Sequence, residues 1–72
     1  MKHYTLEAVI DGRDIVFNKT FTSRNSAMKY ISEYYAKNDI PMTIADEYPV
    51  DGNIHNIEYQ CDYFNRFKIC RI

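Results

Sequence analysis

The sequence predicts an α+β domain of the order ββαββ, in which one helix packs on one face of an antiparallel sheet of about four strands. Three observations predict this class. Apolar and polar residues alternate towards both ends of the chain, apolar residues recur at helical spacing in between, and turn-forming residues separate these segments. Seventy-two residues are expected to form a single compact domain, 1–72, because a chain of this length does not build a second core.

The first predicted element is a β-hairpin. Residues 4–10 alternate in polarity, residues 15–21 alternate again, and Asp11-Gly12 between them is a turn signal. A loop of two or four residues places the apolar face of the first strand beside that of the second, whereas a loop of three residues does not. The pattern therefore favours an even loop.

A helix from Arg24 to Lys37 is expected next. Either Thr22 or Ser23 can cap it by accepting a hydrogen bond from a first-turn N–H. The apolar positions at helical spacing are Ala27, Tyr30, Ile31, Tyr34 and Tyr35. Asn38 suits a left-handed cap, and Pro41 prevents the helix from continuing.

Residues 40–53 show no clear period. Thr43 can cap one short turn that Pro49 ends, and Asp51-Gly52 is a second turn signal. We expect this segment to be an ordered loop that covers an edge or one end of the sheet.

The last predicted element is a second β-hairpin. With a three-residue loop at positions 63–65, Cys61 lies opposite Phe67 and the apolar residues of both strands share one face. Asn65 then takes the left-handed conformation that such a loop needs. A two-residue turn would instead place Cys61 opposite Cys70, but it mixes apolar and charged residues on each face. In the favoured register the two cysteines point to opposite faces, which leaves no disulfide.

No motif in the chain fixes a chemistry. Zinc would require His3, His55, Cys61 and Cys70 to converge from separate elements. No nucleophile motif stands beside a histidine, and no glycine-rich phosphate loop is present. We therefore expect no catalytic residue, no cofactor, no metal ligand and no enzyme activity. Residues 46–52 carry carboxylates near Gly52, but their spacing departs from that of a calcium loop. Only weak cation binding by this segment therefore stays open.

Charge is segregated along the chain. Six acidic residues and no lysine or arginine lie between positions 38 and 65, so all nine lysines and arginines lie outside this window. The predicted C-terminal hairpin places Glu58 and Asp62 beside Lys68 and Arg66, which partly neutralise them. The acidic residues that stay unpaired surround Tyr48, and they are Asp39, Asp46, Glu47 and Asp51.

These residues favour a small cytoplasmic regulator or inhibitor that binds another protein, one with a basic surface. Aromatic residues beside charges are typical of protein-binding hot spots, although tyrosines also fold back over small cores. The partner-binding residues that we expect are Asp46, Glu47, Tyr48, Asp51, Tyr63 and Phe64. No segment is apolar enough for a signal peptide or a membrane span, so we expect no membrane partner. Short length and many residues with A/T-rich codons fit a phage or mobile-element accessory protein, such as an anti-defence protein.

An alternative hypothesis is a nucleic-acid-binding module that uses the outward face of the N-terminal hairpin. Its phosphate contacts would be Lys2, Arg13, Lys19 and Arg24. The stretch Phe21-Thr22-Ser23, followed by Ala27, Tyr30 and Ile31, resembles the strand-to-helix pattern in the arm-type DNA-binding domains of phage integrases. Those domains are basic and place a third strand before the helix, so this resemblance assigns no DNA contact. A third hypothesis is self-assembly through Val9 and Val16 on the same outward face.

Overall fold

The computed structural model describes residues 2–72 of the chain. It contains one helix and five strands. In chain order these are β1 (Tyr4–Ile10), β2 (Arg13–Phe21), α1 (Arg24–Lys37), β3 (Asp46–Val50), β4 (Asn53–Gln60) and β5 (Arg66–Arg71). The α+β class with one helix on an antiparallel sheet is therefore confirmed, and the sheet has five strands rather than about four.

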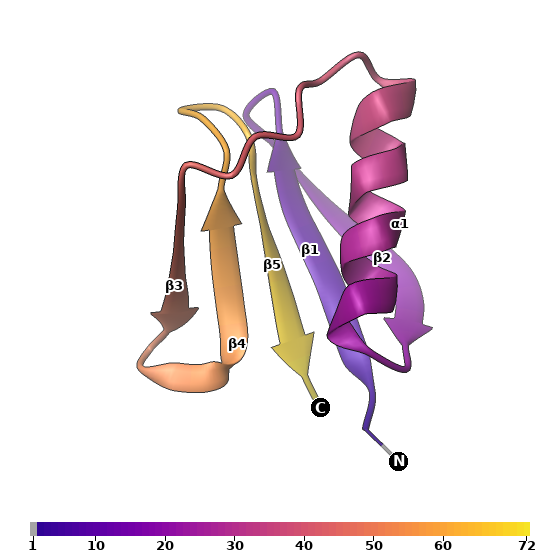
Figure 1. The fold of residues 1–72 in the computed structure, drawn as a ribbon, viewed down its shortest axis with the longest axis vertical. Helices are drawn as coiled ribbons and strands as arrows, with labels where there is room; N and C mark the ends of the chain where they lie inside the picture. Colours follow the sequence, from indigo (N-terminus) through magenta and orange to yellow (C-terminus); the bar gives the residue numbers. More distant parts are fainter. Residues whose placement is uncertain (1) are drawn as a thin grey trace.

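The five strands follow the order β2-β1-β5-β4-β3, and every neighbouring pair is antiparallel. The C-terminal strand β5 thus lies in the middle of the sheet, and β2 and β3 form its two edges. Figure 1 shows α1 lying across one face of the sheet on the side of β1 and β2. The opposite face carries no helix among the described residues.

The N-terminal hairpin forms as the alternation predicts. Ile10 pairs with Arg13, so the turn has two residues, Asp11 and Gly12, with φ values of 53° and 78°. A two-residue turn with two successive positive φ values has a backbone twist that matches the twist of the flanking strands, and glycine adopts a positive φ without strain. Further along, three residues of β2 bulge opposite a single residue of β1. Because two extra residues preserve the alternation, the apolar face of β2 stays on the side of the helix.

Helix α1 has the predicted bounds. Ser23, rather than Thr22, is its N-cap, and its side chain accepts a hydrogen bond from the Ser26 N–H at 3.1 Å. The left-handed residue after the helix is Asp39, with a φ of 56°, whereas Asn38 has a φ of −104°. The prediction of a left-handed Asn38 is therefore wrong by one position.

The prediction of a loop over residues 40–53 is wrong for Asp46–Val50, which pair with β4 as strand β3. Charged residues and proline disfavour strands in the sheet interior, but both are common on edge strands, where one side of the backbone meets no neighbour. The helical turn expected after Thr43 does not form. Asp51 and Gly52 do form the predicted turn, again with two positive φ values.

The C-terminal hairpin has the predicted faces but a different register. Tyr59, not Cys61, pairs with Phe67, and the loop spans the five residues 61–65. The shift equals two residues, and a shift of two leaves every side chain on its predicted face. Asn65 has no positive φ, so its expected left-handed conformation is also wrong. Both cysteines are free.

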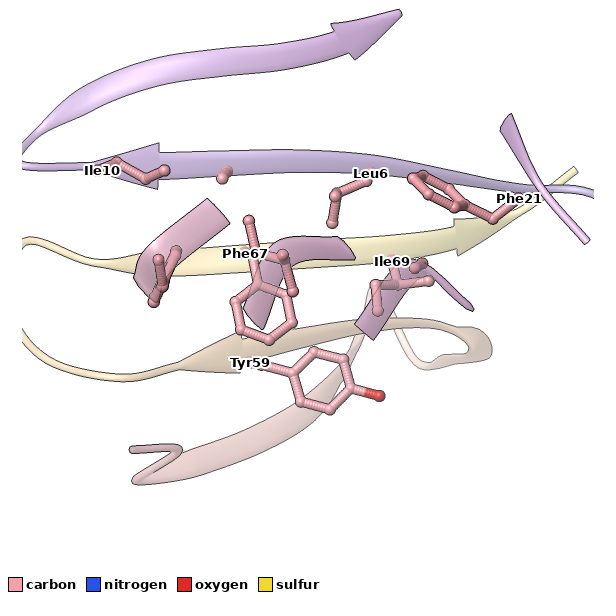
Figure 2. Packing of buried hydrophobic residues seen from close by; sticks show 10 residues of the cluster. Leu6, Ile10, Phe21, Tyr59, Phe67 and Ile69 are labelled. Atoms are coloured by element: carbon pink, nitrogen blue, oxygen red, sulfur yellow. The ribbon is translucent and has the colours of Figure 1, made fainter. Parts of the chain in front are cut away.

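The hydrophobic core lies between the sheet and the helix. Figure 2 shows the side chains of Leu6, Phe67 and Tyr59 pointing to this side from three adjacent strands. The rings of Tyr59 and Phe67 stack with centroids 4.9 Å apart, and the buried helix residues Ala27, Ile31 and Tyr35 cover the cluster. Burying large rings is how a short chain obtains a core without disulfide or metal crosslinks.

Candidate functional site

The loop between β4 and β5 presents two aromatic side chains at one end of the sheet. Tyr63 is 84% exposed and Phe64 is 58% exposed. Their rings contact each other edge-on, with centroids 5.0 Å apart. The sequence left open whether these rings fold back over the core, and in the structure they lie away from it.

The loop that carries these rings is held by the Asp62 carboxylate. It accepts hydrogen bonds from the backbone N–H groups of Phe64 and Asn65, at 2.8 and 2.9 Å, and from the Asn65 side-chain amide. The Asn65 carbonyl in turn accepts from the N–H groups of Cys61 and Asp62. These contacts close the loop on itself. The Asp62 carboxylate is therefore used to hold the loop. Arg66, which was expected to lie opposite Asp62, lies opposite Gln60.

The loop is also tied to the β1–β2 turn. The side-chain oxygen of Asn65 accepts a hydrogen bond from the Asp11 N–H at 3.0 Å, and the Phe64 carbonyl accepts from the Gly12 N–H at 3.2 Å. Asn65 is 7% exposed, the one buried polar side chain among the described residues. Two turns that are far apart in sequence thus brace each other. Both aromatic rings project from a fixed support, because the backbone beneath them is bonded on both sides.

The acidic residues predicted to bind a partner lie on both ends of edge strand β3. Asp46 and Glu47 begin the strand, and both are exposed. Asp46 pairs with Gln60, the last residue before the loop that carries Tyr63. Asp51 lies in the turn after β3, about 16 Å away at the ordinary rise of a strand. Figure 1 shows this turn and the loop with Tyr63 at opposite ends of the sheet. Asp46 and Glu47 therefore lie at the same end of the sheet as the loop with the aromatic rings, and Asp51 lies at the other end.

Tyr48 lies on the face of the sheet that carries no helix. Its side chain is 38% exposed, and its hydroxyl donates a hydrogen bond to the Glu58 carboxylate. This hydrogen bond raises the pKa of Tyr48, with smaller contributions from burial and from the charge of Glu58. The observed register places Glu58 directly opposite Lys68, whereas the predicted one placed Gln60 there, but the Lys68 ammonium forms its ion pair with Glu7, at 3.5 Å. Glu58 is thus occupied within the sheet, whereas Asp46 and Glu47 face solvent.

The outer edge of β3 offers few backbone donors. Pro49 has no N–H, so its position fits a site where the backbone of β3 points away from β4. Glu47, two residues earlier, points its N–H to the same side, and the Asp46 carboxylate accepts that N–H at 2.9 Å. Both outward positions of the strand therefore lack a free donor. An edge of this kind resists the addition of a further strand.

Two of the cations expected to contact nucleic acid lie on the helix side of the sheet instead. The Arg24 guanidinium donates hydrogen bonds to the carbonyls of His55 and Ile69, at 2.9 and 3.4 Å, and to the Tyr59 hydroxyl. The Lys19 ammonium lies 4.6 Å from the centroid of the Tyr30 ring. The outward face of the N-terminal hairpin therefore lacks both charges.

The described residues contain no group of three or more His, Cys, Asp or Glu side chains placed to hold a metal ion. Within residues 2–72, no helix is long and apolar enough to cross a membrane. Comparisons of the chain with protein families, with curated proteins and with solved structures found no match. Sequence reasoning found the exposed rings of the site and missed Asn65, whose side chain holds their loop.

Proposed function

We propose that this protein is a small regulator or inhibitor that binds another protein through one end of its sheet. The contact surface, here called the tip surface, consists of Tyr63, Phe64, Asp46, Glu47 and Tyr48. The observation that carries the proposal is the display of two exposed aromatic rings on a loop that is hydrogen-bonded from both sides.

Binding through these two rings orders little of the backbone. A pair of exposed rings loses contact with water when a partner covers it, and aromatic residues are enriched among the few side chains that dominate binding energy. Because the loop around Tyr63 and Phe64 is already bonded to Asp62 and to the β1–β2 turn, little backbone freedom is left to lose on binding. Such a loop suits a preformed contact.

The charge of the tip surface indicates the kind of partner. Asp46 and Glu47 are exposed and form no ion pair within residues 2–72. A partner with a basic rim around an apolar pocket complements both the carboxylates and the rings. Since the β3 edge lacks free donors, the contact is made by side chains and not by adding a strand to the sheet. A phage or mobile-element protein that blocks a basic groove of a host protein would fit this description.

Affinity capture from a lysate of the source organism tests the proposal, with bound proteins identified by mass spectrometry. The double variant Tyr63→Ser/Phe64→Ser should lose the partner, with affinity for the isolated partner falling at least about tenfold. Ile54→Ser is the matched control, because Ile54 is also exposed but lies near the opposite end of the sheet. Equal capture by the double variant and the wild type would overturn the proposal.

The electrostatic part of the proposal has its own test. Association measured between about 50 and about 500 mM salt should slow as salt screens the carboxylates. Asp46→Asn should slow association at low salt more than Asp51→Asn does, because Asp51 lies at the other end of β3. An on-rate independent of salt would remove the charge contribution and leave the aromatic contact standing.

A further inference from the structure

A second surface feature lies at the other end of the molecule, between the end of β2 and the first half of α1. It is a shallow hollow, and its polar lining consists of Lys19, Thr20, Thr22, Ser26, Lys29 and Glu33. In Figure 1 the end of β2 and the start of α1 lie together, far from the loop that carries Tyr63. The hollow is therefore independent of the tip surface.

One cation of the hollow is held in place by aromatic rings. The Lys19 ammonium lies 4.6 Å from the centroid of Tyr30 and 5.5 Å from that of Phe21. Lys19 belongs to the bulge of β2, and bulges re-aim side chains relative to the regular strand. Attraction between an ammonium and the faces of two rings restricts where the charge lies. Lys19 is thus partly ordered before any ligand arrives.

The other groups of the hollow complete a donor set. Ser26 and Lys29 are three positions apart on the same side of α1, and Thr20 and Thr22 bring hydroxyls from the end of β2. Within residues 2–72, neither Lys19 nor Lys29 forms an ion pair. Glu33 is the one carboxylate of the lining. The hollow therefore has two cations against a single negative charge. Its aliphatic hydroxyls come from Thr20, Thr22 and Ser26, and that of Ser26 also hydrogen-bonds to the Ser23 hydroxyl at 2.9 Å.

We propose that this hollow binds the dianion of a phosphate monoester. Such a group carries close to two negative charges near neutral pH and presents three strong acceptor oxygens. Two ammonium groups complement two charges, and hydroxyls can donate to the remaining oxygens. A phosphodiester carries one negative charge, so its electrostatic attraction to the two lysines is weaker. The phosphate belongs either to a free small molecule or to a phosphorylated side chain of another protein.

Amide NMR of the full chain tests this site, with inorganic phosphate as the probe near pH 7.5 and chloride holding the ionic strength constant. We expect saturable shifts at Thr20, Thr22 and Ser26, with a dissociation constant of about 1–10 mM. Dimethyl phosphate, a diester, should bind at least about threefold more weakly. A phosphoserine peptide that binds more tightly than inorganic phosphate would identify a protein-borne ligand, and equal or weaker binding would identify the free group.

Variants of α1 separate a built site from general attraction. Lys29→Gln should weaken phosphate binding at least about threefold, whereas Lys37→Gln, on the same helix but outside the hollow, should leave it within about 1.5-fold. Glu33→Gln should strengthen binding, because it removes the opposing charge. This gain does not depend on any variant losing stability, and thermal unfolding of each variant verifies that it is folded.

Four results would overturn the proposal. They are shifts reproduced by chloride at the same ionic strength, a Lys37→Gln effect as large as that of Lys29→Gln, no gain from Glu33→Gln, and equal binding of dimethyl phosphate.

Discussion

At the scale of single residues, the tip surface depends on two polar side chains that sequence reasoning treated as ordinary. Asp62 was expected to pair with Arg66, and Asn65 was expected to supply only a left-handed backbone. In the structure Asp62 closes the loop and Asn65 joins it to the Asp11 N–H. The exposure of Tyr63 follows from its place in a turn, which the sequence shows. The role of Asn65 depends on which turn lies beside it, and that is a property of strand order.

The hydrogen bonds that hold the loop at residues 61–65 should depend on the protonation state of Asp62. Hydrogen bonds from the Asn65 side chain, then from the Phe64 N–H, lower the pKa of Asp62 below its ordinary value of 3.8. A lowered folded-state pKa means that this stabilisation is complete above pH 3.8 and is lost as the pH falls through the folded-state value. Amide shifts of Phe64 and Asn65, followed by NMR from about pH 7 to about pH 2, should show a midpoint below 3.8.

Asp62→Asn is the control for this titration, because the amide keeps the size of the side chain and has no proton to gain in this range. The transition at Phe64 and Asn65 should vanish in that variant. A wild-type midpoint at or above 3.8 would contradict the assignment of the loop hydrogen bonds to the ionised carboxylate.

At the scale of elements, the sequence predicts the strands and the helix whose apolar residues repeat at a regular spacing. It does not predict the features that depend on which strands pair. Hairpin β1–β2 and helix α1 were placed correctly because their apolar residues repeat every two and about every 3.6 positions. Strand β3 was missed because its sequence, DEYPV, carries no such repeat and is held by β4. The register of β4 against β5 was wrong by two residues, since alternation alone does not distinguish registers that differ by two.

The proline that made β3 hard to predict also protects this edge strand from pairing with another chain. Pro49→Thr restores an outward N–H on this edge, so the variant should form larger species at concentrations where the wild type does not. Light scattering after size-exclusion chromatography measures this change. Losing a proline also raises the entropy of the unfolded chain, and stability should change by about 1 kcal/mol or less.

Pro41→Thr is the matched substitution, because Pro41 precedes β3 and lies outside the sheet. It should leave the size distribution unchanged. If Pro49→Thr behaves in the same way, the missing N–H is not what keeps the edge free.

At the scale of the whole molecule, one arginine joins parts of the sheet that are distant in sequence. Arg24, at the start of α1, donates to carbonyls of both β4 and β5, and its guanidinium lies 5.4 Å from the centroid of the Tyr4 ring in β1. The helical pattern of the sequence assigns Arg24 to the polar side of the helix, and this is wrong. Arg24 lies three positions before the buried Ala27, and its guanidinium reaches the sheet. Its partners come from strands whose order the sequence does not specify.

Removing this link should destabilise the molecule as a unit. Arg24→Gln should lower the free energy of unfolding by about 1–3 kcal/mol, because charged hydrogen bonds to carbonyls are lost. Arg13→Gln, at an exposed position of β2, should change it by about 0.5 kcal/mol or less. Urea unfolding followed by circular dichroism gives both values, and equal values for the two variants would show that Arg24 links nothing.

The central place of β5 has a consequence for how the protein is made. During synthesis, hairpin β1–β2 and helix α1 leave the ribosome well before the strand that fills the middle of their sheet. Until residues 66–71 arrive, β1 and β4 each present a bare inner edge, and the pairs that close the sheet, such as Leu6 with Ile69, span most of the chain. Contacts of such long sequence separation form slowly, and exposed edges can capture other nascent chains meanwhile. A frameshift in the codons for β5 would therefore remove the middle of the fold and leave two hairpins with nothing between them.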